Sequence, residues 1–181
     1  GQRELAVAAY RVLANGGRLF LAAPTGIGKT ISVLFPAIKA LGEAKLERIF
    51  YLTARTVGRT IAEKALADLR QGGLKLRSVT LTAKEKVCVR AGQPCDPLTC
   101  PLALGYYDRI KPAIREALGR EEATRSSLEA VAQQHQVCPF ELSLDASLWA
   151  DAIICDYNYV FDPQVYLRRF FAEEPGEFGF L

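Results

Sequence analysis

The sequence predicts an α/β protein in which helices flank a parallel sheet, interrupted by a mostly helical insertion. Over residues 1–83, short apolar runs alternate with stretches of helical spacing, and the connections between them are short. Over residues 84–150 this alternation stops, and the segment holds four of the five cysteines and five of the nine prolines. An apolar strand returns within residues 151–181. The sequence therefore divides into three segments with these bounds.

The first elements follow from apolar spacing and helix-ending residues. Residues 3–14 predict a helix that Asn15-Gly16-Gly17 ends. Residues 18–23 (RLFLAA) predict a buried strand. Residues 29–41 predict a second helix, and Pro36 inside it removes a backbone donor, so we expect a bend or a break there.

The rest of the chain is assigned in the same way. Strands are predicted at three apolar runs, residues 48–53, 75–82 and 151–155. Helices are predicted at three amphipathic stretches, residues 56–69, about 101–119 and about 124–135. In the first of these helices, the side chains expected to face the core are those of Val57, Ile61, Ala65 and Leu69.

Composition and charge indicate the class of protein but do not identify its binding partner. The chain has 181 residues, half of them hydrophobic, a net charge of +3 and a pI near 8.6, which is compatible with a nucleic-acid partner without requiring one. No apolar stretch reaches the ~18–20 residues of a transmembrane helix, and the N-terminus lacks a signal-peptide pattern. We therefore expect a cytosolic protein that does not bind membranes.

Residues 23–30 (APTGIGKT) are a variant of the phosphate-binding loop G-x-x-x-x-G-K-[ST], with alanine first. Gly26 and Gly28 let backbone N–H groups turn toward phosphate oxygens, and the following helix adds its positive end. Lys29 can reach the β- and γ-phosphates, and the Thr30 hydroxyl can ligate Mg²⁺. A glycine-rich turn that merely starts a helix is the alternative. The predicted nucleotide-binding residues are Ala23, Pro24, Thr25, Gly26, Ile27, Gly28, Lys29 and Thr30, the last two with catalytic roles.

Four cysteines lie in polar, proline-rich loops, at Cys88-x6-Cys95-x4-Cys100 and then, after 37 residues, Cys138. Four thiolates can close a tetrahedral zinc site or hold an iron–sulfur cluster. Structural zinc sites favour C-x2–4-C pairs, whereas the uneven gaps here suit a larger cubane. Free buried cysteines are the alternative, but core cysteines lie in apolar segments, as only Cys155 does.

The phosphate loop and the four-cysteine insertion together resemble the iron–sulfur DNA helicases of superfamily 2, the XPD-like and DinG-like enzymes, especially the bacterial ones. The resemblance covers essentially the whole chain and rests on APTGIGKT, FYLTARTVGRTIAEKAL, CVRAGQPCDPLTCP and CPFELSLDASLWADAIICDYNYVFDP. It implies a RecA-like fold for the first motor domain, made of residues 1–83 and 151–181. Residues 84–150 would form the iron–sulfur domain.

The resemblance also implies an activity and residue roles. ATP with Mg²⁺ would bind at the phosphate loop, and Gln2 stands where the family often has a glutamine that recognises adenine, although the arginine expected before it is missing. The DNA strand would be contacted by Thr53, Arg55 and Thr56. A 4Fe–4S cluster would be held by Cys88, Cys95, Cys100 and Cys138. The implied activity is ATP hydrolysis coupled to translocation on single-stranded DNA and unwinding of forked duplexes in repair or replication.

The position of Arg55 supports the DNA role independently of the resemblance. Arg55 follows a predicted strand, and ligands gather at strand carboxyl ends in open α/β sheets. A guanidinium there can pair with phosphate, and nearby threonine hydroxyls can add hydrogen bonds. A solvated arginine at the start of a helix is the alternative.

The sequence lacks the Asp-Glu-Ala-His block that these helicases need for hydrolysis. Residues 176–181 (GEFGFL) look like the start of a new strand, and in the family the block follows soon after this point. We therefore interpret the chain as an N-terminal piece of a helicase without full activity of its own. Two other interpretations stay open: another P-loop phosphotransferase, and a non-enzymatic zinc-containing module that binds nucleic acid.

Overall fold

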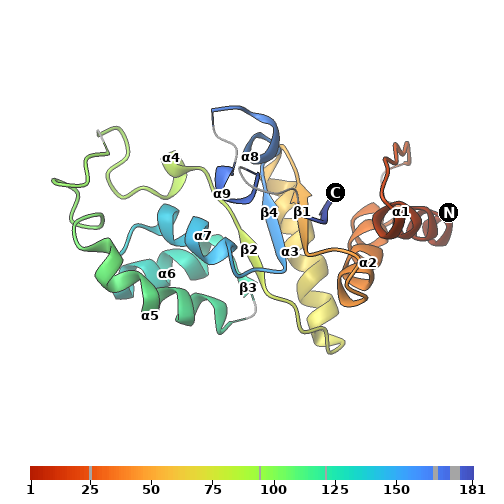
Figure 1. Ribbon diagram of the computed structural model, residues 1–181, viewed down its shortest axis with the longest axis horizontal. Helices are drawn as coiled ribbons and strands as arrows, with labels where there is room; N and C mark the ends of the chain where they lie inside the picture. The colour runs from red at the N-terminus through yellow and green to blue at the C-terminus, as the bar shows by residue number, and fades with distance from the viewer. Residues whose placement is uncertain (25, 94, 121, 165–166, 172–175) are drawn as a thin grey trace. The chain divides into compact units, whose positions relative to one another are not determined.

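The chain forms two compact units in the computed structural model, which describes all residues except 25, 94, 121, 165–166 and 172–175. The terminal unit consists of residues 1–74 and 157–181, and the central unit of residues 75–156 (Figure 1). All four cysteines of the predicted insertion belong to the central unit.

The terminal unit combines one pair of parallel strands with helices. β1 (Arg48–Leu52) pairs with β5 (Phe178–Phe180), and Ile49 lies opposite Gly179. α1 packs on α2, and α2 also contacts α3 and β1. The helices of this unit are, in chain order, α1 (Gln2–Asn15), α2 (Lys29–Gly42), α3 (Thr56–Gln71), α8 (Asn158–Phe161) and α9 (Arg168–Phe171).

Phe50 on β1 is the centre of an aromatic core in the terminal unit. Its side chain is fully buried, and its ring centroid lies 5.5 Å from those of Phe170 and Phe178 and 5.4 Å from that of Phe180. Such edge-to-face and stacked pairs stabilise a core beyond the burial of their area. Aromatic packing therefore attaches α9 and β5 to β1, in addition to the backbone hydrogen bonds of the strand pair.

The central unit is built around β2 (Ser78–Thr80), which lies between β3 (Glu122–Ala123) and β4 (Ala152–Cys155) and is parallel to both. Every residue of β2 and β4 is buried, as expected for parallel strands covered on both faces. The helices are α4 (Lys84–Val87), α5 (Tyr106–Leu118), α6 (Arg125–His135) and α7 (Pro139–Ser147).

Helices α5, α6 and α7 pack on one another, and α7 packs on β2. The α/β architecture with parallel strands and the mostly helical character of the insertion are thus confirmed. Cys155 is fully buried, as predicted for a core residue. The sequence did not predict the short strand β3, the one-turn helices α4, α8 and α9, or α7, which begins directly after Cys138.

The prediction of a buried strand over residues 18–23 is wrong. These residues have no strand hydrogen-bonding pattern, and the Phe20 side chain is 91% exposed. Leu19, Phe20 and Leu21 instead line a groove of about 620 Å³ together with α1 and β5. A strand is stabilised by the ladder to its neighbours as well as by apolar side chains. The two described strands of this unit pair with each other, so residues 18–23 run alongside without joining a ladder.

Two expectations about helices are also corrected. Pro36 does not break α2, which runs from Lys29 to Gly42 with Pro36 buried, so burial of the ring offsets the lost backbone donor. In α3 the fully buried side chains are Ala62 and Leu66, whereas Val57 is 68% and Ile61 49% exposed. The core-facing stripe of α3 is therefore rotated from the predicted one.

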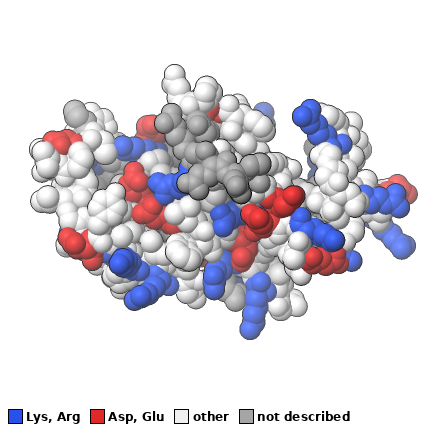
Figure 2. Space-filling view, viewed as in Figure 1, with Lys and Arg blue, Asp and Glu red and all other residues white. Residues whose placement is uncertain are grey.

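Basic and acidic side chains lie interspersed on the face shown in Figure 2. This pattern agrees with the small net charge of +3. Within the described part of the chain, no helix is both long and apolar enough to cross a bilayer.

Candidate functional site

The predicted phosphate loop leads directly into α2. Gly26 and Gly28 have φ values of 88° and 74°, in the left-handed region that favours glycine, and Gly28 is the N-cap of α2. The N-cap glycine has no side chain that could bond the first N–H groups of the helix, and N–H groups at a helix N-terminus can bind an anion. Left-handed glycines that lead into a helix N-terminus are features of phosphate-binding loops. Thr25 lies outside the described residues.

The two polar side chains at the start of α2 are held close to the loop. Lys29 Nζ donates to the carbonyl oxygens of Ala23 at 2.9 Å and Pro24 at 2.7 Å. The ammonium group is therefore folded over the loop, within reach of any phosphate that the loop would bind. Thr30 Oγ1 lies 3.5 Å from the hydroxyl of Tyr51, the second-last residue of β1. The Thr30 side chain is therefore near the carboxyl end of this strand.

The side chain of Gln2 lies beside the phosphate loop. A Cβ atom placed on Gly28 would come within 2.5 Å of Gln2 Nε2, so the loop backbone and this amide are in close approach. The structure thus brings together Gln2 and the loop, which are separated by more than twenty positions in the sequence.

The predicted DNA-contacting residues gather where β1 ends and α3 begins. Arg55 is the N-cap of α3, and Thr56 is its first residue; both are exposed. The Arg55 backbone N–H donates to Thr53 Oγ1 at 3.3 Å. Gly58 makes room for this arrangement, because a Cβ there would overlap Thr53 Oγ1 and lie 3.1 Å from Thr53 Cβ. The sequence did not single out Gly58, since the requirement comes from a contact across the turn.

The four predicted cysteine ligands are placed at the ends of helices and in loops of the central unit. Cys88 follows α4, Cys138 is the N-cap of α7, and Cys95 and Cys100 lie in the loop between α4 and α5. The described residues contain no group of three or more cysteine, histidine, aspartate or glutamate side chains close enough to hold a metal ion. The donor chemistry therefore fits a sulfur-ligated metal group, but the sulfurs are not gathered around one centre.

Several pairwise contacts nevertheless link the cysteine segments. A hydrogen bond to Cys95 raises the pKa of the Lys84 amine, and the charge of Cys138 acts in the same direction. Burial raises the pKa of the Cys138 thiol, and the neighbouring charge of Cys88 adds to this effect. Lys84 therefore interacts with the Cys95 and Cys138 segments, although the thiols form no metal-binding group among the described residues.

The Cys100 thiol has a different environment. Burial alone would raise its pKa, but the backbone N–H groups of Leu102 and Ala103 and the Arg90 guanidinium hold that pKa below its usual range. Donors of this kind favour the thiolate, which is the form that binds metals.

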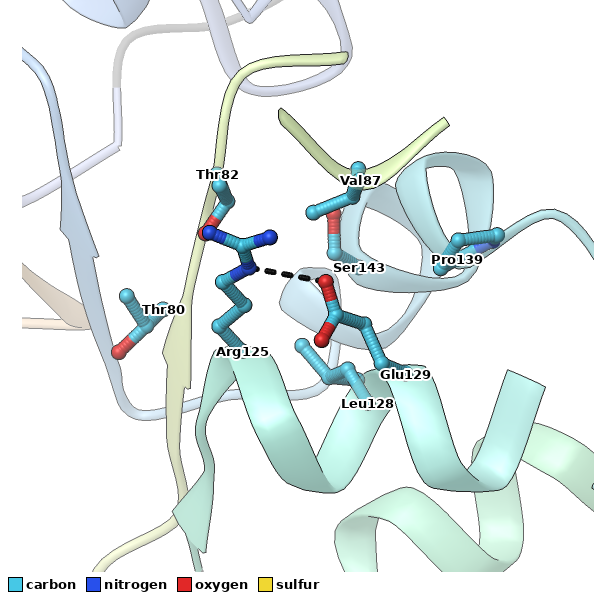
Figure 3. Close-up of a pocket in the computed structure, with 8 residues that line it drawn as sticks. All are labelled: Thr80, Thr82, Val87, Arg125, Leu128, Glu129, Pro139 and Ser143. Carbon is cyan, nitrogen blue, oxygen red and sulfur yellow. Dashed lines mark hydrogen bonds and ion pairs between the residues drawn. The ribbon is translucent and has the colours of Figure 1, made fainter. Parts of the chain in front are cut away.

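The small cavity in Figure 3 lies near the first cysteine. Residues of β2, α4, α6 and α7 line it. Within it, Arg125 Nε donates to Glu129 Oε1 at 2.8 Å, and both residues belong to α6. With a volume of about 10 Å³ it has room for no more than one water molecule, so it is not a substrate site. Arg125 also donates to the carbonyl oxygen of Lys86 at 2.6 Å, which ties α6 to the turn before Cys88.

Comparison with known proteins places this fold and these segments in a family. Residues 53–172 match the DEAD_2 family, which is more than half of the chain. The chain belongs to the DEAD_2 family. The match begins at Thr53, after the phosphate loop, and includes all four predicted cysteine ligands.

One relative of this DEAD_2 protein is an XPD helicase subunit. The general transcription and DNA repair factor IIH helicase subunit XPD of Dictyostelium discoideum is 25% identical over 193 aligned residues, which cover 91% of this chain and 25% of that subunit. The chain thus spans about a quarter of the length of this relative. The resemblance to XPD-like superfamily 2 helicases is therefore confirmed.

Two solved structures share the fold. An XPD helicase aligns with a TM-score of 0.66 and 21% identity over 99% of this chain and 31% of its own. A truncated XPD aligns with a TM-score of 0.60 and 20% identity over 90% of this chain and 46% of its own. The first alignment includes the phosphate loop, which lies outside the DEAD_2 match.

In the segment after β4, one of two tyrosines is exposed enough to stack on a DNA base. Tyr157 and Tyr159 provide two aromatic rings that could stack on bases. Tyr157 is 48% exposed, but Tyr159 is only 9% exposed in α8. Only Tyr157 therefore presents a ring for stacking.

Proposed function

We propose that this DEAD_2 chain is the ATP-binding part of an XPD-like DNA helicase that works in the bacterial cytosol. The complete enzyme would couple ATP hydrolysis to movement along single-stranded DNA and to unwinding of forks. The single observation that carries the proposal is the phosphate loop, in which two left-handed glycines lead into the uncapped N-terminus of α2 beside the Lys29 ammonium. The family membership and the similarity to XPD support the helicase class.

Each loop residue would have a defined task in binding the nucleotide. The N–H groups in the first turn of α2 would donate to phosphate oxygens. Lys29 would exchange its two carbonyl acceptors, Ala23 and Pro24, for the β- and γ-phosphates. Thr30 would ligate Mg²⁺, which offsets phosphate charge when bound. Gln2 would contact the base.

The DNA strand would pass over the start of α3. Arg55 and Thr56 are exposed there, and the Thr53 hydroxyl lies in the same turn. A guanidinium, hydroxyls and backbone N–H groups are the donors that commonly bind phosphodiester oxygens. These contacts would position the strand without reading its sequence.

We further propose that Cys88, Cys95, Cys100 and Cys138 hold a 4Fe–4S cluster. Their thiols fit this group chemically and belong to one unit, and N–H donors to the sulfurs of Cys100 and Cys138 are of the kind found around cluster ligands. Metal binding supplies free energy that draws ligands to coordination distance. In this proposal the cluster is structural.

The nucleotide proposal is tested with Lys29→Ala in the intact chain. Removing the ammonium is expected to weaken binding of a fluorescent ATP analogue with Mg²⁺ by roughly 10- to 100-fold, as for a lost charge-assisted hydrogen bond. Lys45→Ala removes the same charge from an exposed position and should leave binding unchanged. Equal affinity of Lys29→Ala and the original chain would remove the phosphate loop from the proposal.

Metal analysis distinguishes the remaining alternatives. Iron with acid-labile sulfide and a broad visible absorption supports the cluster. One zinc and no iron per chain would favour the non-enzymatic zinc module, and transfer of phosphate from ATP to a small acceptor would favour a phosphotransferase. Serine in place of any one proposed ligand should lower the iron content, and a variant with full iron content would remove that cysteine from the set.

A further inference from the structure

Arg109 in the first turn of α5 holds two cysteine segments at once. Its Nε donates to the carbonyl oxygen of Gln136 at 3.1 Å. Its Nη2 donates to the carbonyl oxygens of Pro101 at 3.2 Å and Leu104 at 2.7 Å. One half-buried guanidinium therefore connects two stretches of backbone that are more than thirty residues apart.

The carbonyl groups that Arg109 binds flank two of the proposed ligands. Pro101 directly follows Cys100, and Gln136 lies two residues before Cys138. A planar guanidinium has donors in fixed directions, so it fixes the relative position of the acceptors that it bridges. Because Arg109 holds the backbone just after Cys100 and just before Cys138, it restricts where the two sulfurs can lie.

The backbone beside Arg109 is shaped to accept the guanidinium. Gly105 is the N-cap of α5 and has a φ of +67°, in the region that favours glycine. A Cβ at Gly105 would come within 2.8 Å of Arg109 Nη1, so a larger residue would displace the guanidinium. Both the conformation and the space at position 105 therefore favour the bridge.

Two other arginines bind the backbone near the cysteines, but each binds the carbonyl oxygen of a single residue. Arg90 donates to the Thr99 carbonyl at 2.8 Å, next to Cys100, and Arg125 donates to the Lys86 carbonyl before Cys88. Arg90 also donates to the Gln93 side chain at 2.8 Å, before Cys95. Among these three arginines of the described chain, Arg109 differs in that its hydrogen bonds join two backbone stretches more than thirty residues apart.

We propose that Arg109 is a positioning residue that couples the Cys100 and Cys138 segments, so that their sulfurs are presented to a metal group as a pair. The proposal rests on the proposed function in that these cysteines are taken as ligands. The coupling itself is a property of the polypeptide and can be measured without metal.

The test compares hydrogen exchange at one amide in each segment of the intact, metal-free chain. The Leu104 N–H donates to the Cys100 carbonyl, and the Val137 N–H donates to the Ala132 carbonyl, so these amides report on the two segments. Arg109→Gln removes the charge-assisted bonds and should speed exchange at both amides by roughly tenfold. Arg115→Gln is the matched control, because Arg115 is an exposed arginine on the same helix.

Arg109→Lys separates the bridge from the charge. The lysine ammonium is a compact point charge that cannot reproduce the planar fork, so at least one amide should still exchange faster than in the original chain. This variant also keeps the charge and the aliphatic stem if Arg109→Gln fails to fold. After reconstitution with iron and sulfide, both Arg109 variants should retain less than half of the iron that Arg115→Gln retains.

Several outcomes would overturn the coupling. Unchanged exchange at both amides in Arg109→Gln would do so, and so would a change at only one amide, because a residue that holds one segment does not couple two. Full recovery of both amides by Arg109→Lys would assign the effect to charge alone. If the original chain binds no iron, the cluster proposal fails, and the exchange measurements still decide the role of Arg109.

Discussion

Replacing Gly58 with alanine should destabilise the chain, although alanine is the better helix former. Gly58 lies in the first turn of α3, where the exchange alone would stabilise the helix by up to about 1 kcal/mol. The added Cβ would overlap Thr53 Oγ1 and lie 3.1 Å from Thr53 Cβ, so the threonine side chain must move. The move breaks the 3.3 Å hydrogen bond from the Arg55 N–H, which contributes about 1 kcal/mol, and displacement of packed atoms costs about 1–3 kcal/mol. With the full helix-propensity gain subtracted, we expect a net loss of about 1–3 kcal/mol.

A double-mutant cycle with Thr53→Ala measures this conflict. The alanine removes the hydroxyl that Gly58→Ala displaces, so in that background Gly58→Ala should cost little or should stabilise. The coupling free energy between the two positions should therefore be at least as large as the net loss of about 1–3 kcal/mol, well above the ~0.5 kcal/mol scatter of independent sites. Urea unfolding of the four chains, followed by circular dichroism, gives each value.

The same variants test the DNA proposal. Since Thr53 must turn away when position 58 carries a Cβ, Gly58→Ala should also weaken binding of single-stranded DNA in conditions where the chain stays folded. Gly42→Ala is a matched control, because Gly42 ends α2 and a Cβ there meets no atom within 4 Å. If Gly58→Ala alone is more stable than the original chain, the close approach of Thr53 and Gly58 does not control this turn, and the reasoning is refuted.

Two further predictions concern the central unit. The carboxylate of Glu116 accepts hydrogen bonds from His135 and Arg120, which lower its pKa in the folded chain. Its contribution to stability is therefore present above the usual glutamate pKa of about 4.3 and is lost as the pH falls through the folded value. Glu116→Gln should flatten the acid limb of a plot of unfolding free energy against pH, and an unchanged plot would contradict this. Tyr106, buried, donates to Asp145 at 2.8 Å, so Tyr106→Phe should lower the free energy of unfolding by about 1–2 kcal/mol in urea titrations, and a neutral effect would show that the bond contributes nothing.

The sequence was sufficient for elements whose pattern is local. β1 and β4 were predicted to within one residue of their observed bounds, because a parallel strand buried on both faces is a continuous apolar run. The helix spacing of α1 and α6 gave their bounds equally well, and in both cases a glycine or a threonine cap marks an end.

Elements that depend on distant partners could not be predicted in this way. Residues 18–23 have the apolar run of a strand, but whether they join a ladder depends on which strand lies beside them. In α3, Ala65 and Leu69 border both the predicted and the observed stripe, so the spacing alone allows either face. The rotation of α3 about its axis depends on α2, which packs against it, and the sequence of α3 alone does not specify that contact.

The same distinction between local and distant determinants applies to the candidate sites. The glycine turn into α2 was predictable because the residues that form it are consecutive, whereas its phosphate-binding role stays a prediction. The cysteines could be recognised as donors, but their separation depends on how α4, α5 and α7 pack. Arg109 was missed because an arginine that binds backbone carbonyls has no spacing signature: its acceptors lie on Pro101, Leu104 and Gln136, and any residue type could supply them.

Family membership and assembly of the sulfur ligands are therefore separate questions for this chain. The DEAD_2 match depends on sequence from residue 53 to residue 172, whereas a cluster depends on bringing four thiolates to one centre. Four like charges repel one another unless a cation offsets them, so the polypeptide can fix the segments without fixing the final sulfur positions. Contacts to backbone carbonyls, such as those of Arg109, suit this task because they hold the chain just after Cys100 and just before Cys138 and leave the thiols free to bind. The arrangement of these anchors, more than the distance between thiols, is what a sulfur-ligated site in this unit would require of the protein.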